Sequence, residues 1–286
     1  MNGLGMHLHE DLLDGEPVRW LEHGEGAAVV LVHGVPTSPR LWRHVLPLVR
    51  GRCLALEMRG YGSSIPDEEG DRDLGLAAQA DRLLRWLDLV GVEASVLVGH
   101  DLGGGVAQIA AVRGPGRFSG IMLTNAVCYD SWPIPSVKAM RRAAPILRYL
   151  PETALYPSFV QLIHRGHDNR ARALESLGMH WQHYVAHGAA RSLMRQVSAL
   201  RVEDTLAIAD QLPALGLPAR VVWGEADQFQ KVEYGRRLAA DIGTTLQTIP
   251  GGKHFTPEDH PDAIAAAVNE LLVPRPPGTD GDDHGR

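Results

Sequence analysis

The chain has 286 residues, of which 44% are hydrophobic, and it carries a formal net charge of −6. This length and apolar content suit one large domain with an insertion better than two independent domains. No basic run and no long apolar stretch occurs, so we expect neither nucleic acid nor a membrane as a partner. Residues 1–10 lack the pattern of a secretory signal, which makes the cytoplasm the expected compartment. The two cysteines, Cys53 and Cys128, show no metal-ligand spacing, so we expect no metal and no cofactor.

Two short strands and a helix are expected in the first part of the chain. Residues 27–32 form a continuous apolar run, which suits a parallel strand covered on both faces. This run leads directly into a His-Gly-Val-Pro segment at residues 33–36. After a second strand at residues 53–58, leucines and alanines recur at helical spacing over residues 76–90. That spacing predicts an amphipathic crossover helix.

A strand, a sharp glycine-lined corner and a helix are expected next. The strand at residues 95–98 runs into Gly-His-Asp-Leu-Gly, and a helix follows over residues 103–113. Small residues on both sides of the corner permit the strained turn of a nucleophile elbow, which pushes its central side chain above the sheet. Asp101 occupies that central position. A carboxylate that attacks a saturated carbon forms an ordinary ester that water can cleave, so Asp101 favours an alkylating substrate over an acylating one.

The later part of the chain divides into a helical insertion and a return to the strand and helix alternation. A strand at residues 120–125 completes a βαβ pattern, which implies a parallel, doubly wound sheet with right-handed crossovers. No convincing strand follows until residue 213. We therefore predict a core at 1–128, a helical insertion at 129–212, a second part of the core at 213–273 and a disordered tail at 274–286. Within the insertion, helices are expected at about 136–150, 158–164, 171–187 and 205–211.

Two further polar residues follow strands of the second core part. Asp227 comes after the strand at residues 219–224, and His254 comes after the strand at residues 244–249. The carboxyl ends of parallel strands meet at one edge of a sheet, so both residues are expected near Asp101. Nucleophile, acid and histidine then occur in the chain order found in α/β-hydrolases.

Taken together, the His-Gly-Val-Pro segment, the elbow and this residue order resemble the α/β-hydrolase superfamily, in the branch of epoxide hydrolases and haloalkane dehalogenases. The resemblance implies an α/β-hydrolase fold in which the insertion forms a cap over a buried apolar pocket. It further implies that the backbone N–H groups of Val35 and Leu102 form an oxyanion hole and that the bond into Pro36 is cis. His33 and Asn125 are expected to support this site.

The expected mechanism has two steps. Asp101 attacks the substrate carbon and becomes an alkyl ester; His254, oriented by Asp227, then activates a water molecule that cleaves the ester. The expected partners are a small apolar substrate and water, and the protein is expected to be a monomer or a homodimer. A small-molecule binding protein on the same fold is the alternative outside enzymes.

The leaving group separates the candidate activities. Haloalkane dehalogenases place a tryptophan directly after the nucleophile and an Asn or Trp after the His-Gly pair, whereas this chain has Leu102 and Val35 there. Asn125 and Trp132 are candidate replacements for these halide donors. Epoxide hydrolases use two cap tyrosines to protonate the opening ring, and Tyr149 and Tyr184 are predicted to serve here. An epoxide hydrolase acting on a small apolar epoxide is therefore the leading hypothesis, with a haloalkane dehalogenase or an ester or lactone hydrolase as alternatives.

Overall fold

One mixed sheet forms the centre of the computed structural model, which describes residues 5–65 and 72–273. In these residues eight strands lie in the order β1-β2-β4-β3-β5-β6-β7-β8, and β3 to β8 are all parallel. The strands are β1 (His7–Leu13), β2 (Glu16–His23), β3 (Ala28–Val32), β4 (Arg52–Leu56), β5 (Ser95–His100), β6 (Phe118–Thr124), β7 (Ala219–Gly224) and β8 (Leu246–Ile249). The predicted α/β class with a doubly wound parallel sheet is confirmed. The predicted tail at 274–286 lies outside the described residues.

Both faces of the parallel sheet are buried, because successive side chains of each strand alternate between two apolar layers. One layer packs against α1 (Leu76–Leu89), α2 (Leu102–Arg113) and α8 (Val232–Asp241). The other packs against α10 (Pro261–Leu272) and the short 3₁₀ helices η1 (Pro39–Trp42) and η2 (Leu46–Leu48). This burial explains why the strands read as continuous apolar runs rather than alternating ones.

An antiparallel hairpin, which the sequence analysis did not predict, extends one edge of the sheet. Strands β1 and β2 pair antiparallel, with Leu13 opposite Glu16 next to the turn, and β2 pairs antiparallel with β4. The two-residue turn contains Asp14 and Gly15, both with positive φ, which is the backbone that such tight hairpin turns require. Most of β1 is exposed, so its sequence lacks the apolar run that identifies the central strands.

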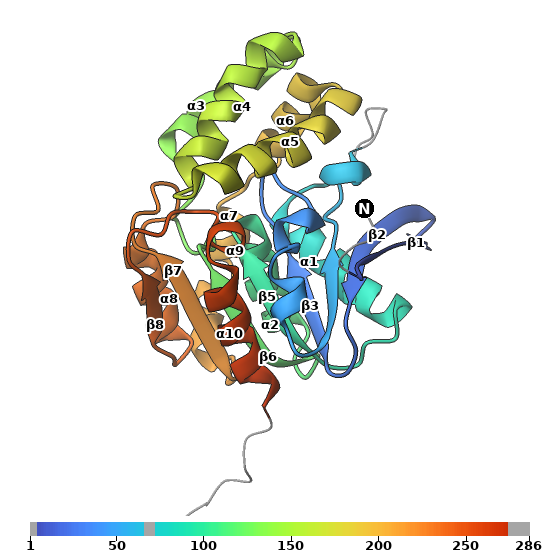
Figure 1. Ribbon diagram of the computed structural model, residues 1–286, viewed down its shortest axis with the longest axis vertical. Helices are drawn as coiled ribbons and strands as arrows, with labels where there is room; N and C mark the ends of the chain where they lie inside the picture. Colours follow the sequence, from blue (N-terminus) through green and yellow to red (C-terminus); the bar gives the residue numbers. More distant parts are fainter. Residues whose placement is uncertain (1–4, 66–71, 274–286) are drawn as a thin grey trace, which may run out of the picture.

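A helical insertion separates β6 from β7, and we define it as residues Pro135–Ser198. It comprises α3 (Pro135–Leu147), α4 (Glu152–Gly166), α5 (Arg170–Ala186) and α6 (Ala189–Ser198), and α7 (Glu203–Leu206) and η4 (Ala209–Ala214) lead back to the sheet. Figure 1 shows α3 to α6 gathered at one end of the molecule, beyond the edge of the sheet. The boundaries at 129 and 212 remain predictions.

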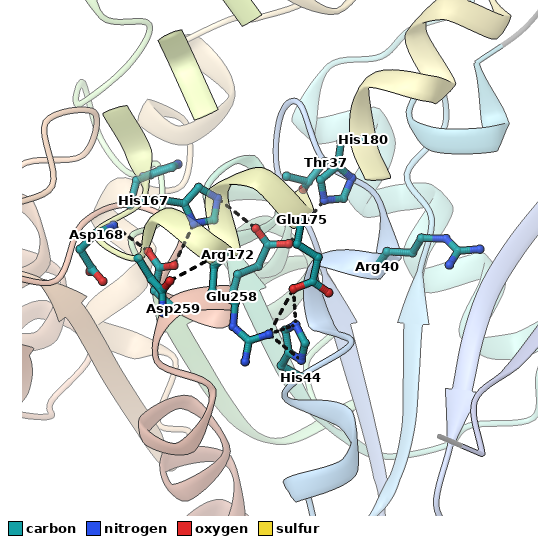
Figure 2. A network of polar contacts seen from close by, with 12 residues as sticks. Thr37, Arg40, His44, His167, Asp168, Arg172, Glu175, His180, Glu258 and Asp259 are labelled. Atoms are coloured by element: carbon teal, nitrogen blue, oxygen red, sulfur yellow. Dashed lines mark hydrogen bonds and ion pairs between the residues drawn. The ribbon is translucent and has the colours of Figure 1, made fainter. Parts of the chain in front are cut away.

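A buried ion-pair network fastens this insertion to the core (Figure 2). Glu258 on α9 (Thr256–Asp259) is fully buried and pairs with Arg43, which directly follows η1, and with His167, which directly follows α4. Arg43 also binds Glu175 on α5 at 2.9 Å, and His167 binds Asp259 at 2.8 Å. The network lies close to the loop that carries His254, because the His167 ring stacks on Phe255 with 4.6 Å between centroids.

Candidate active site

Asp101 sits at the corner between β5 and α2 with φ of 51° and ψ of −122°. A non-glycine residue rarely adopts a positive φ, and strain of this kind is typical of functional sites. The surrounding glycines make the corner possible. A Cβ atom on Gly103 would lie 2.2 Å from the carbonyl oxygen of Val32, and one on Gly104 would lie 2.3 Å from the Cβ of Ala126. Only glycine allows α2 to start this close to β3 and to the end of β6.

The Asp101 carboxylate is held by backbone donors on one side. The N–H of Val35 donates to its Oδ2 atom at 3.0 Å, and the N–H of Leu102 also hydrogen-bonds to the carboxylate. Burial raises the pKa of Asp101 to about 6, and the nearby His254 together with the two N–H donors limits this rise. The two groups expected to form an oxyanion hole therefore converge on a single carboxylate.

The loop that carries Val35 is fixed by local hydrogen bonds. The Val35–Pro36 peptide bond is cis, as the resemblance implied. His33 is fully buried, its Nδ1 lies 3.0 Å from the carbonyl of Gly34, and its Nε2 accepts the N–H of Met58 at 3.2 Å. Burial lowers the pKa of His33 to about 3, so the ring is neutral and can donate on one side and accept on the other.

His254 lies between two carboxylates. Its Nδ1 atom is 2.8 Å from Oδ2 of Asp227, and its Nε2 atom is 3.8 Å from Oδ1 of Asp101. Burial disfavours the charged imidazole, but Asp227 and then Asp101 outweigh this and raise the pKa of His254. Burial likewise opposes ionisation of Asp227, yet His254 holds the pKa of that carboxyl below its ordinary value. The structure thus brings together the three residues predicted from their order in the chain.

A second set of contacts fixes the orientation of Asp227. Asn125, which directly follows β6, donates from Nδ2 to Oδ2 of Asp227 at 2.6 Å. Its own Oδ1 accepts the hydroxyl of Thr256 at 3.0 Å. The backbone N–H groups of Phe229 and Gln230 donate to the other oxygen of Asp227 at 2.7 and 3.1 Å. Asn125 therefore lies against the acid and not in the cavity, where it could have bound a halide.

His100 is a contact of this site that the sequence analysis missed. Its Nε2 atom lies 2.9 Å from the carbonyl oxygen of His254, and the two rings are 4.8 Å apart. Burial lowers the pKa of His100 to about 3, so the neutral ring can donate this hydrogen bond. Because His100 directly precedes Asp101, it links the elbow to the loop of His254. The position of a histidine inside the elbow motif was the signal that could have identified it.

A small apolar cavity opens onto Asp101 and His254. Its volume is about 120 Å³, and helices α3 and α6 contribute Val137, Met140 and Leu193 to its wall. A larger groove of about 490 Å³ lies along the same two helices, but several arginines line it and none of Asp101, Asp227 and His254 does. The chemistry of the lining side chains, rather than volume, therefore identifies the smaller cavity as the site.

The structure corrects the predicted substrate-binding tyrosines. The prediction for Tyr149 is wrong, because this residue lies beyond the end of α3 and is 79% exposed. Tyr184 is buried, but its hydroxyl donates to Gln196 at 2.8 Å and it does not line the cavity. Trp132 does line the cavity, although its indole N–H donates to Thr205 at 2.8 Å. None of these three side chains offers a donor to a substrate.

Within residues 5–65 and 72–273, no three His, Cys, Asp or Glu side chains are arranged to hold a metal ion. Across the same part of the chain, no helix combines the length and the apolar character needed to cross a bilayer.

Comparison with known proteins agrees with this geometry. The model of the alpha/beta hydrolase family matches residues 29–267. Haloalkane dehalogenase 2 of Mycobacterium tuberculosis is 30% identical over 274 residues, which cover 88% of this chain and 90% of that protein. Bifunctional epoxide hydrolase 2 of Sus scrofa is 32% identical over 139 residues, which cover 47% of this chain and 25% of that protein. Among solved structures, an alpha/beta hydrolase fold protein from Burkholderia ambifaria superposes with a TM-score of 0.81 at 26% identity. The superposition covers 92% of this chain and 100% of the Burkholderia chain. The chain belongs to the α/β hydrolase family.

Proposed function

We propose that this protein is a hydrolase that cleaves its substrate through a covalent alkyl ester on Asp101. One observation carries the proposal: the Asp101 carboxylate has Oδ2 held by the N–H of Val35, while Oδ1 lies 3.8 Å from Nε2 of His254. A nucleophile that is already anionic needs no base, so His254 is available for the second step. Asp101 thus acts as the nucleophile of the first step, and His254 acts as the base of the second step.

In the first step, Oδ1 of Asp101 attacks an sp³ carbon, and the bond from that carbon to the leaving group breaks with its electron pair. In the second step, Nε2 of His254 takes a proton from water, and the resulting hydroxide adds to the ester carbonyl carbon. The negative charge then develops on Oδ2, which the N–H of Val35 holds, while the N–H of Leu102 donates to the same carboxyl group. Collapse of this intermediate releases the alcohol, which recovers the proton from His254, and leaves Asp101 as the carboxylic acid. Loss of that proton to solvent regenerates the carboxylate.

A halide is the leaving group that needs no proton donor from the cavity wall, although Asn125 and Trp132 are bound to Asp227 and Thr205 and do not replace the two missing halide donors. An epoxide opens to an alkoxide, which needs a proton donor, whereas a halide leaves as a stable anion. No hydroxyl side chain lines the cavity in the described residues, and the tyrosines expected to protonate an epoxide lie elsewhere. The M. tuberculosis relative that matches over most of the chain is named as a haloalkane dehalogenase. We therefore infer that the activity is haloalkane hydrolysis.

The cavity also limits substrate size. Its volume is about 120 Å³, and most of its lining side chains are apolar. A short-chain haloalkane fits such a space, whereas a long-chain substrate requires the insertion to move.

The test is to trap the ester in a variant that cannot hydrolyse it. His254→Gln protein is incubated with 1-bromopropane and, separately, with propylene oxide, and its intact mass and the released bromide are measured. We expect a propyl group on Asp101 with one bromide released per chain, and no adduct when Asp101→Asn is added to the same background. Rapid turnover by His254→Gln, or an adduct that survives Asp101→Asn, would overturn the proposal. An adduct with propylene oxide alone would assign epoxide opening instead.

A further inference from the structure

We propose that the side-chain amide of Gln230 binds a hydroxyl group on the substrate, so that the enzyme prefers short haloalkanes that carry a hydroxyl over plain haloalkanes. This inference rests on the proposed function and deepens it. Two observations lie behind it: Gln230 lines the catalytic cavity, and the oxygen of its side-chain amide is buried without a hydrogen-bond partner.

The backbone of Gln230 is fixed on both sides. Its N–H donates to Oδ1 of Asp227 at 3.1 Å, and its carbonyl accepts the indole N–H of Trp223 at 2.8 Å. The residue is only 3% exposed. Because the first of these hydrogen bonds also orients Asp227, the backbone at Gln230 cannot move into solvent without disturbing Asp227. The backbone of Gln230 is therefore held in place where the residue lines the cavity.

The other polar side chains of the cavity wall already have a role or a hydrogen-bond partner. Apart from Gln230, the polar side chains that line it are Asp101 and His254, and the indole N–H of Trp132 is bound to Thr205. The Oε1 atom of Gln230 is buried and has no hydrogen-bond partner among the described residues. A buried acceptor left without a donor is costly, and such groups in native proteins usually mark a function.

A hydroxyl group fits this amide whichever way the amide is turned. It can donate to the carboxamide oxygen or accept from the carboxamide nitrogen. A plain haloalkane has no donor, so its binding would leave the amide oxygen unsatisfied. Sites built around a buried hydrogen-bonding group discriminate strongly against analogues that lack the matching group. Gln230 and Asp101 line the same small cavity, so a single short chain can place its reacting carbon at one and its hydroxyl at the other.

The test is a competition for Asp101 in the His254→Gln background. Equal concentrations of 1-bromopropane and 3-bromopropan-1-ol compete in one tube, and intact mass gives the ratio of propyl to hydroxypropyl ester. With Gln230 present we expect the hydroxypropyl ester to exceed the propyl ester by about tenfold. In the Gln230→Met variant, which keeps the length of the side chain, this preference should vanish or reverse.

Matched controls separate substrate recognition from packing. Gln228→Leu alters a neighbouring glutamine whose side chain binds Arg165 at 2.6 Å instead of lining the cavity, and it should leave the ratio unchanged. Gln230→Met should melt at the same temperature as the parent or higher, since it removes an unsatisfied buried oxygen. A lower melting temperature with an unchanged ester ratio would show a structural role and overturn the inference.

The two proposals fail in different ways. If both esters form at a ratio that does not respond to Gln230→Met, haloalkane hydrolysis stands and the hydroxyl preference is refuted. If no ester forms, the proposed function is refuted, and the role of Gln230 is decided by binding alone. In that case we expect 1,3-propanediol to raise the melting temperature of the wild-type protein more than 1-propanol does, with the difference lost in Gln230→Met. Equal shifts in the wild-type protein would refute the inference.

Discussion

His167 predicts a loss of stability at alkaline pH that one substitution should remove. The ring is buried between Asp259, at 2.8 Å, and Glu258, at 3.1 Å. Burial opposes its charged form, but the two carboxylates outweigh this and raise the pKa of His167 from 6.5 to about 9. A histidine with a raised pKa stabilises the fold fully below pH 6.5, and this contribution is lost as the pH rises through about 9. A pKa difference of this size corresponds to about 3 kcal/mol.

The assay is urea unfolding of wild-type and His167→Gln protein at a series of pH values from 6.5 to about 9. The wild-type free energy of unfolding should fall by about 3 kcal/mol more across this range than that of the variant. His260→Gln is the matched control, because His260 pairs with Asp168 at 2.8 Å but remains partly exposed to solvent, which screens the pair. It should keep the wild-type slope. Equal slopes for wild type and His167→Gln would refute the argument, because His167 would then not carry the buried charge.

Three further predictions concern the elbow and the triad. Burial raises the pKa of Asp101 to about 6, so the rate of ester formation should fall about tenfold per pH unit below that value as the carboxylate is protonated. Bromide release in a single turnover measures this rate, and a rate that does not change with pH would contradict the prediction. Gly103→Ala places a Cβ atom 2.2 Å from a backbone oxygen and should lower the free energy of unfolding by about 3 kcal/mol or more. Gly178→Ala in α5 is the control, because its Cβ atom meets open space and should raise the free energy of unfolding by about 1 kcal/mol. Thermal denaturation measures both changes. Asn125→Ala removes the 2.6 Å hydrogen bond to Asp227 and should slow hydrolysis of the ester but not its formation. Rapid-quench mass spectrometry should therefore find more ester at steady state. A slower first step would contradict a role of Asn125 through Asp227.

The parallel part of the fold could be predicted from sequence because its strands are covered on both faces. Strands β3 and β5 are buried along almost their whole length; β3 is apolar throughout, and β5 contains the apolar run at residues 96–98. The β1–β2 hairpin was missed because β1 is largely exposed and carries polar residues. The Asp14-Gly15 pair was nevertheless a hairpin signal in the sequence. Helix α6 was also missed, although it buries Leu193, Met194 and Val197 along one face.

The site also contains residues that the sequence predicts and residues that it does not. Asp101, Asp227 and His254 each follow a parallel strand, and the topology of the sheet alone brings such residues to one edge. The cavity wall depends instead on how the insertion packs. Tyr149 was expected to face the pocket, but α3 ends at Leu147, before this residue, and its side chain is exposed. Gln230 was overlooked because a single glutamine in a loop has no periodicity that indicates a buried position.

The nucleophilic role of Asp101 is tested most directly by a single turnover in water labelled with a heavy oxygen isotope. Excess wild-type protein is mixed with a short bromoalkane, and both the alcohol and the peptide that contains Asp101 are analysed by mass spectrometry. If Asp101 forms the ester, the first alcohol released carries unlabelled oxygen from the carboxylate, and the label appears in Asp101. Label in the first alcohol, with none in Asp101, would mean that water attacks the substrate directly and would contradict the account.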